Sequence, residues 1–308
     1  MQRAQRAAGD ESRHRRSRDG LARRRARPAR RGLGVARLSR HVGGDERIGS
    51  SARQHVAAEL AVHGGRIALE FFHRARRDDA CEDPVEADIR QRLAAKIAAA
   101  FPDDAVVGAE PGQPGGRSHG LYSWVVAPGE TIRAGGLGLP GFAVSIGVLR
   151  SGLPFVGAVY DPLARWLFTA CAGRGAWLNE RPLHARPTPL SRASMVAIGS
   201  PLEPGLPPFA EEWLRRYRLR GFGSTALHVC YVAMGALDLV HDHRASLLDV
   251  AGAAAVVLEA GGVVTRVDGA PIFPASREHL AGAPLALLAG NRTSHAEALA
   301  EVSLLTPA

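Results

Sequence analysis

The sequence contains very little cysteine and almost no lysine. Its three cysteines, Cys81, Cys171 and Cys230, are far apart, and none of them forms a Cys-x-x-Cys pair. A sparse, odd number of cysteines argues against a disulfide framework and against a structural zinc site. We therefore expect free thiols in a reducing, cytoplasmic environment.

Long apolar runs are also missing. No segment reaches the roughly 18 apolar residues that a membrane-spanning helix needs, so we expect no membrane partner. The first residues carry many arginines without an apolar segment behind them, which argues against a secretory signal. The glycine-rich stretch 133–141 has no P-loop lysine, because Lys96 is the only lysine of the chain. Nucleotide binding by that route is therefore disfavoured.

The positive charge is confined to the N-terminus. Residues 1–50 hold 15 arginines and 5 acidic residues, a net of +10, and the whole chain carries +9, so residues 51–308 carry −1. A segment with so little aliphatic periodicity cannot offset its chain entropy by burial, and we predict a disordered Arg-rich tail over 1–50. The tail lacks aromatic residues that could stack on bases, so nucleic acid is not an expected partner.

Residues 51–308 have the pattern of a folded domain, with halves at about 51–185 and 186–308. Apolar periodicity predicts helices over 52–75 and 84–100, with Gly64-Gly65 as a weak point in the first. Short apolar or alternating runs between Gly/Pro turns then predict a sheet built largely from hairpins. These runs are 105–108, 123–127, 142–150, 154–162, 165–173 and 173–183.

The second half alternates strands with helices. The predicted strands are 194–200, 219–223, 238–242, 263–267 and 286–291. The predicted helices are 207–218, 224–236, 247–262 and 294–302, and Ser224 is the expected N-cap of the second. Helices, sheet, helices, sheet and helices in this order predict an α/β fold, a layered αβαβα sandwich.

Carboxylates occur at several element ends. Asp88 and Asp249 lie at helix starts, Glu110 follows a strand, and Glu130 lies in a Pro-Gly loop. Carboxylates from separate loops can converge on Mg²⁺, which prefers oxygen ligands. Each of them, taken singly, is explained more simply as a helix cap or a first-turn residue.

Two histidines, His241 and His243, are spaced i, i+2 in a predicted strand. This spacing places both on one face of the strand. No third ligand is evident nearby, so we predict solvated histidines and no metal site.

A series of motifs along the chain resembles the inositol monophosphatase family. In order they are E-A-D, G-x-E, W-V-V-x-P-x-x-T, GFAVSIGVLRSGLPFVGAVYDP, GRGAWLNERPL, RGFGSTALHVCYVAMGALDLV and LLDVAGAAAVVLEAGGVVT. The resemblance covers about residues 55–303. It implies the αβαβα sandwich of the inositol monophosphatase type, Mg²⁺-dependent hydrolysis of small phosphate monoesters such as inositol or sugar phosphates, and a homodimer.

The resemblance also implies three sets of site residues. Asp88 and Glu130 would be catalytic. Asp242, Ser224 and Gly223 would bind the substrate. Glu110, the Gly129 carbonyl, Glu130 and Asp249 would hold the metal.

The sequence departs from the family where cations bind. Working members read GEE, DP-[IL]-DGT and WD-x-AAG, whereas this chain has Ala109 for the first acid of GEE, and Ala127 and Ile132 for the first aspartate and the threonine of the DGT loop. Alanine offers no charge and no lone pair to a metal. Two interpretations stay open: a Mg²⁺-dependent phosphatase with weak or altered activity, or a non-catalytic member that binds a phosphorylated ligand or a protein partner.

Overall fold

A computed structural model of the chain describes residues 46–75, 85–107, 121–128, 140–199 and 205–305. All of them belong to one compact unit, residues 42–308. The predicted disordered tail lies outside the described residues up to residue 45, and helix α1 (Glu46–Ala75) begins within its last residues. In the described part of the chain, no helix combines the length and apolarity needed to cross a membrane.

The first sheet contains seven strands in chain order, β1 to β7. β1 and β2 are parallel, and every later neighbour pair is antiparallel. The hairpins predicted from the Gly/Pro turns are therefore confirmed. The strands are β1 (Ala105–Val107), β2 (Tyr122–Ala127), β3 (Val144–Arg150), β4 (Leu153–Asp161), β5 (Trp166–Cys171), β6 (Ala176–Leu178) and β7 (Arg181–Leu183).

The second sheet has the order β11-β12-β10-β8-β9. β8 is parallel to both β9 and β10, whereas β12 is antiparallel to β10 and β11. The carboxyl ends of β8, β9 and β10 therefore lie at the same edge. The strands are β8 (Met195–Ile198), β9 (Arg218–Arg220), β10 (Leu239–Ser246), β11 (Val263–Arg266) and β12 (Pro284–Gly290).

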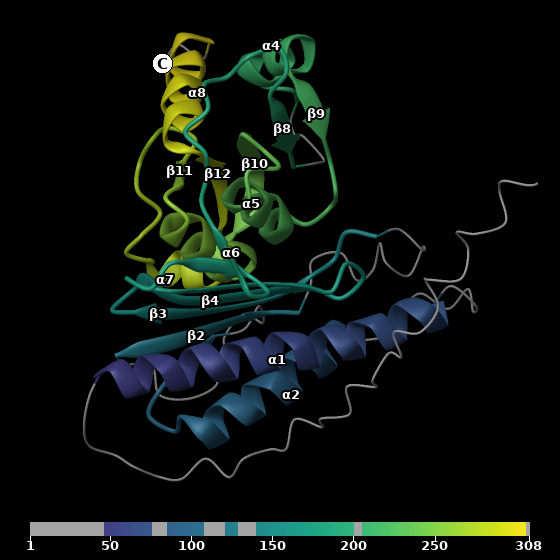
Figure 1. Ribbon diagram of the computed structural model, residues 1–308, viewed down its shortest axis with the longest axis vertical. Coiled ribbons are helices and arrows are strands. Elements are labelled where there is room, and N and C mark those ends of the chain that lie inside the picture. Colours follow the sequence, from purple (N-terminus) through teal and green to yellow (C-terminus); the bar gives the residue numbers. More distant parts are fainter. Residues whose placement is uncertain (1–45, 76–84, 108–120, 129–139, 200–204, 306–308) are drawn as a thin grey trace, which may run out of the picture. The chain divides into compact units, whose positions relative to one another are not determined.

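Three layers of helices cover these sheets (Figure 1). α1 and α2 (Val85–Ala100) share one core cluster with the first sheet. α5 (Thr225–Ala233) and α6 (Leu247–Glu259) share a second cluster with strands of both sheets. α4 (Pro208–Arg216) and α8 (Arg292–Leu305) pack on the second sheet in a third. The predicted layered αβαβα sandwich is confirmed, and the short α7 (Arg277–Leu280) is an element that the sequence pattern did not predict.

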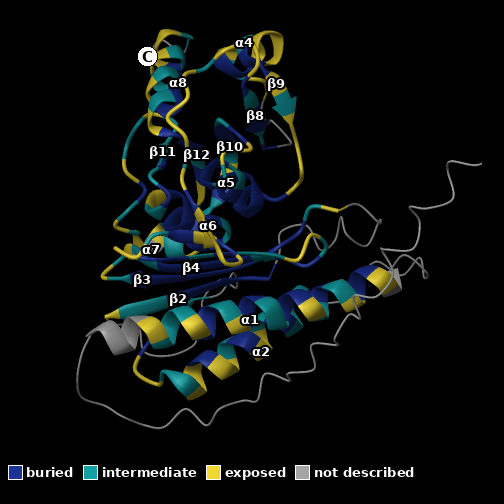
Figure 2. Ribbon diagram, in the orientation of Figure 1, coloured by how far each residue is buried: buried dark blue, intermediate teal, exposed yellow. Residues whose placement is uncertain are grey.

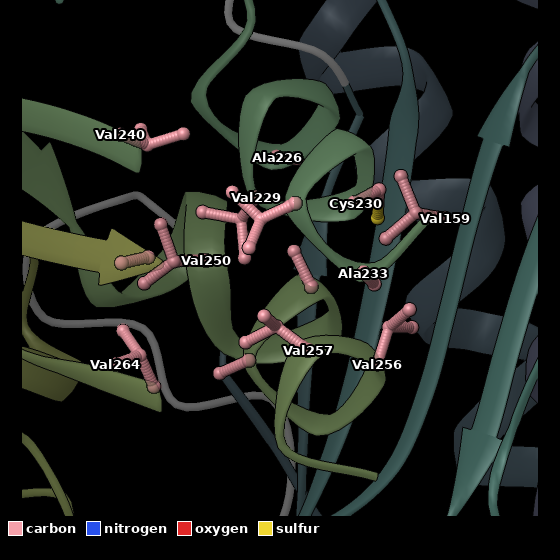
Figure 3. Packing of buried hydrophobic residues seen from close by; sticks show 14 of the residues in the cluster. Val159, Ala226, Val229, Cys230, Ala233, Val240, Val250, Val256, Val257 and Val264 are labelled. Carbon is pink, nitrogen blue, oxygen red and sulfur yellow. The ribbon is translucent and has the colours of Figure 1, made fainter. Parts of the chain in front are cut away.

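The cores are formed mainly by small and branched aliphatic side chains. β3 and β4 are drawn largely in dark blue because helices cover both faces of the first sheet (Figure 2). Figure 3 shows the middle cluster, in which Val229 and Ala226 of α5 lie close to Val250 and Val257 of α6, and Val159 of β4 closes one side. Cys171 and Cys230 are buried free thiols.

The glycine pair in α1 is a packing surface and not a weak point. The helix is continuous through Gly64 and Gly65. A Cβ atom on Gly65 would lie 2.4 Å from Cδ1 of Tyr160, and one on Gly64 would lie 3.1 Å from Cδ1 of Leu93. The prediction was wrong because local propensity carries no information about what packs against the helix.

The backbone of α6 packs directly on the first sheet. A Cβ atom on Gly157 of β4 would lie 2.1 Å from the carbonyl oxygen of Gly252 in α6, and one on Gly147 of β3 would lie 2.8 Å from the carbonyl carbon of Ala251. The far end of α6 is fixed as well, because Glu259 accepts hydrogen bonds from the amides of Gly173 and Gly175, 3.0 and 2.9 Å long. α6 is thus held at a fixed depth and tilt.

We expect Gly157→Ala to destabilise the fold. The new methyl group collides with a backbone oxygen that cannot move aside alone, and overpacking of this kind costs about 1–3 kcal/mol. Urea unfolding at neutral pH measures the difference. Gly205→Ala is the matched control because a Cβ atom there meets no atom of the described residues within 4 Å. Equal stability of the two variants would contradict the packing argument.

Candidate functional site

The carboxyl ends of β8, β9 and β10 supply one half of the candidate site. In open α/β sheets, ligands bind where the carboxyl ends of parallel strands meet. Gly199 follows β8, residues 221–223 follow β9, and Asp242 lies within β10 just before a register shift. The Gly199 amide donates to the carbonyl oxygen of His241 at 2.8 Å, so the ends of β8 and β10 are joined.

Asp242 is held by groups from three elements. Its Oδ2 accepts a hydrogen bond from Oγ1 of Thr225, the first residue of α5. Its Oδ1 accepts from the backbone amide of Arg244 at 2.9 Å. The carboxylate also lies against Gly199, where a Cβ atom would be 2.3 Å from its Cγ. Asp242 is only partly buried, so this oriented carboxylate remains available to a ligand.

The loop between β9 and α5 is anchored by a buried histidine. Nε2 of His228 accepts a hydrogen bond from the Phe222 amide at 2.9 Å. Burial lowers the pKa of His228 to about 4, although the negative charge of Asp242 opposes the shift. His228 is therefore neutral near pH 7, as its acceptor role requires. Gly223, with φ of +86°, completes the turn.

Ser224 is the N-cap of α5, as predicted. Its Oγ accepts a hydrogen bond from the Leu227 amide at 3.3 Å, and the residue is buried. The preceding loop touches the segment that enters β3, since a Cβ atom on Gly141 would lie 1.9 Å from the carbonyl oxygen of Phe222. Gly141, just before β3, therefore contacts the loop that is predicted to bind the substrate.

The carboxyl end of β2 supplies the other half of the site. Ala127 is the last residue of this strand, is buried, and pairs with Ser145 of β3. The first turns of α6 pack here, because Leu248 and Ala251 form a cluster with Val125 of β2. The end of β2, which the sequence motifs predict to be part of the site, therefore carries a buried methyl group.

Asp249 forms part of a capping box at the start of α6. Its Oδ2 accepts hydrogen bonds from the Ser246 amide, at 3.2 Å, and from the Ser246 hydroxyl. The Ser246 hydroxyl oxygen in turn accepts from the Asp249 amide at 3.3 Å. Asp249 therefore stabilises the helix whether or not it also binds a metal.

Of the remaining predicted site residues, the structure describes only Asp88. Asp88 lies in the first turn of α2, where its Oδ1 accepts a hydrogen bond from Nε of Arg92 at 2.7 Å across one helical turn, and its side chain is 41% exposed. Glu110, Gly129 and Glu130 lie outside the described residues. Within the described ranges, no three His, Cys, Asp or Glu side chains gather closely enough to hold a metal ion. The described residues alone therefore do not make a magnesium site.

Comparison with known proteins identifies the family. The profile described as the inositol monophosphatase family matches residues 51–304. The chain belongs to this family. A fructose-1,6-bisphosphatase/inositol-1-monophosphatase of Aquifex aeolicus is 29% identical over 226 residues, which are 69% of this chain and 84% of the relative. The Nus factor SuhB of Pseudomonas aeruginosa is 30% identical over 234 residues, 70% of this chain and 86% of that protein.

A solved structure shows the same fold. The inositol monophosphatase from Anabaena (Nostoc) sp. superposes with a TM-score of 0.71 at 25% sequence identity, over 83% of this chain and 97% of that one. Its agreement with the two sheets and three helical layers described above extends over nearly the whole of the known protein. This chain therefore shares the fold of that inositol monophosphatase.

His241 contradicts the prediction of solvated histidines. It is 1% exposed and lies against the rings of Phe209 and Trp213 of α4. Its Nδ1 donates to the carbonyl oxygen of Leu287 at 3.0 Å, and burial lowers its pKa to about 4. The i, i+2 spacing predicts that His241 and His243 share one face of the strand. It does not predict that α4 covers His241 on this face.

Three residues of the site were missed by sequence reasoning. Thr225 and Gly199 contact Asp242, and His228 anchors the Phe222 amide. Thr225 and His228 could have been identified from the sequence, because both lie in the first turn of a helix that follows a glycine-rich loop. Gly199 gave a weaker signal, as a glycine directly after a buried strand.

We expect the stability of the protein to fall as pH decreases from about 6.5 to 4. His241 takes up a proton near pH 6.5 in the unfolded chain but only near pH 4 in the folded one, so acid favours unfolding. His241→Gln should remove roughly 3 kcal/mol of this pH dependence. Urea unfolding at pH 7 and pH 4.5 measures it, with exposed His184→Gln as control. An unchanged pH slope in His241→Gln would refute the assignment.

We expect Asp249→Ala and Ser246→Ala each to lower the free energy of unfolding by about 1 kcal/mol in metal-free buffer, because each removes a cap from α6. The double variant should lose less than the sum of the two, since the residues cap each other. Thermal unfolding in EDTA measures all three. Strict additivity would show that the two residues do not cap each other, and no effect of Asp249→Ala would show that the Asp249 side chain does not stabilise α6.

Proposed function

We propose that this chain hydrolyses small phosphate monoesters of the inositol or sugar phosphate type, weakly compared with family members that keep every acid. The observation that carries the proposal is the contrast between the two halves of the site. The carboxylate of Asp242 is oriented by Thr225 and Gly199, whereas the carboxyl end of β2 presents the methyl group of Ala127. The first half supports binding, and the second weakens catalysis.

The substrate would lie at the carboxyl ends of β8, β9 and β10. Asp242 accepts hydrogen bonds from substrate hydroxyl groups, and the backbone at Gly223 and Ser224 lies at the N-terminus of α5, whose dipole favours a negatively charged group. Residues 51–308 carry a net charge of −1, so this part of the chain lacks the excess of positive charge that is typical of nucleic-acid binding. We place the protein in the cytoplasm as a homodimer.

Members of this family generally depend on Mg²⁺. In this chain Glu110, Glu130, the Gly129 carbonyl and Asp249 would hold the cation. A bound cation would neutralise the phosphate and lower the pKa of its bound water. Ala109 and Ala127 remove two carboxylates from this set, and Ile132 removes a hydroxyl group. A single loss of this kind commonly costs about 10²–10³-fold in rate, and losses within one site are not additive, so a rate about 10⁴-fold or more below that of a complete site is the expected scale.

Restoring the missing groups tests this proposal. We expect the quadruple variant Ala109→Glu, Ala127→Asp, Glu130→Asp, Ile132→Thr to release phosphate from inositol 1-phosphate at least about 10²-fold faster than wild type in Mg²⁺. The matched control carries Ala127→Asn in the same background, which supplies the shape of aspartate without its charge. A folded quadruple variant no faster than that control would contradict the proposal.

A second function is favoured by the independence of the hydroxyl-binding half. The carboxylate of Asp242 accepts hydrogen bonds from Oγ1 of Thr225 and from the Arg244 amide, so neutral groups of the protein orient it. A non-catalytic protein that binds a phosphorylated ligand would use it. Binding of inositol 1-phosphate in EDTA, together with no turnover above blank at high protein concentration, would favour this alternative over hydrolysis.

A further inference from the structure

Asp242 is oriented by one buried side chain and one backbone amide. Thr225 is 4% exposed, and its Oγ1 donates to Oδ2 of Asp242. The Arg244 amide donates to Oδ1 at 2.9 Å. Among the described residues, each carboxylate oxygen thus has one donor, and a carboxylate can accept about four hydrogen bonds. The remaining lone pairs are fixed in direction before any ligand arrives.

Gly199 makes this orientation possible. A Cβ atom at this position would lie 2.3 Å from Cγ, 2.5 Å from Oδ2 and 2.6 Å from Oδ1 of Asp242. The carboxylate therefore lies flat against the backbone at the end of β8. Any larger residue would push the carboxylate away from the Thr225 hydroxyl. Gly199 leaves room for the Asp242 carboxylate, and the hydrogen bond from Thr225 sets its direction. The two residues therefore favour the same rotamer of Asp242.

We propose that Thr225 and Gly199 are positioning residues that hold Asp242 in the orientation by which this site selects polyol phosphates over phosphate esters without hydroxyl groups. The inference rests on the proposed function and deepens it by naming the origin of substrate selectivity. A fixed acceptor avoids the ordering cost of a mobile side chain on binding. A site built to accept a hydroxyl hydrogen bond discriminates against analogues that lack the hydroxyl.

The decisive variant is Thr225→Val, which keeps the shape of threonine and removes the donor. KM and kcat are measured in Mg²⁺ for inositol 1-phosphate and for 4-nitrophenyl phosphate, which has no polyol hydroxyls. We expect KM for inositol 1-phosphate to rise about 10-fold with kcat changed less than about 3-fold, as loss of one charge-assisted hydrogen bond implies. KM for 4-nitrophenyl phosphate should stay within about 2-fold of wild type. Thr225→Ser should restore the wild-type selectivity.

Gly199→Ala is an independent second variant. It should produce the same selective loss, because the methyl group displaces the carboxylate that Thr225 holds. Gly205→Ala is its control, since a Cβ atom there meets no atom of the described residues within 4 Å. Unfolding curves of all variants show whether each is folded, and a folded Thr225→Val variant suffices for the test if Gly199→Ala does not fold.

The outcomes separate this inference from the proposed function. Titration calorimetry with inositol 1-phosphate accompanies the kinetics, so that binding is measured even where turnover is slow. A wild-type protein that neither binds nor hydrolyses inositol 1-phosphate overturns both. A wild-type protein that binds it, with Thr225→Val unchanged or weakened equally toward both esters, overturns the positioning role alone.

Discussion

The direct contact between α6 and the first sheet is the constraint on which the rest of the site depends. Gly157 and Gly252 allow the helix backbone to rest on β4 without side chains between them. Asp249 lies one turn before Gly252, and Asp242 lies in the strand that leads into the helix. Because α6 is fixed against the first sheet, Asp249 in its first turn and Asp242 in the preceding strand β10 are fixed as well.

The two halves of the site have different physical requirements. A cation site needs several negative groups brought together from separate loops, and their mutual repulsion must be offset by the ion they hold. In the half around Asp242, one carboxylate accepts hydrogen bonds from two neutral donors, the Thr225 hydroxyl and the Arg244 amide. Neither donor lies near positions 109 and 127 in the sequence, so the residues at those two positions need not affect the orientation of Asp242. Binding and catalysis can therefore change separately in such a scaffold.

The sequence predicted the layers, nearly all strands and helices, and the N-cap at Ser224, because these depend on local periodicity and on capping chemistry. It did not predict contacts between distant segments. Thr225 and Asp242 meet only because α5 begins beside the end of β10. His241 was assigned to solvent because nothing in its strand indicates that Phe209 of α4 covers it. The close approach at Gly65 was missed for the same reason.

Asp249 caps α6 in addition to its proposed role as a metal ligand. Replacement of Asp249 would loosen the start of a central helix before it affected any reaction. Mutational drift in a chain that had abandoned catalysis would therefore still retain this aspartate, for folding alone. Ala127 has no such second duty, since a buried methyl group at a strand end supports the fold as well as a carboxylate would. The fold therefore constrains position 249 through a specific polar contact and position 127 only through burial.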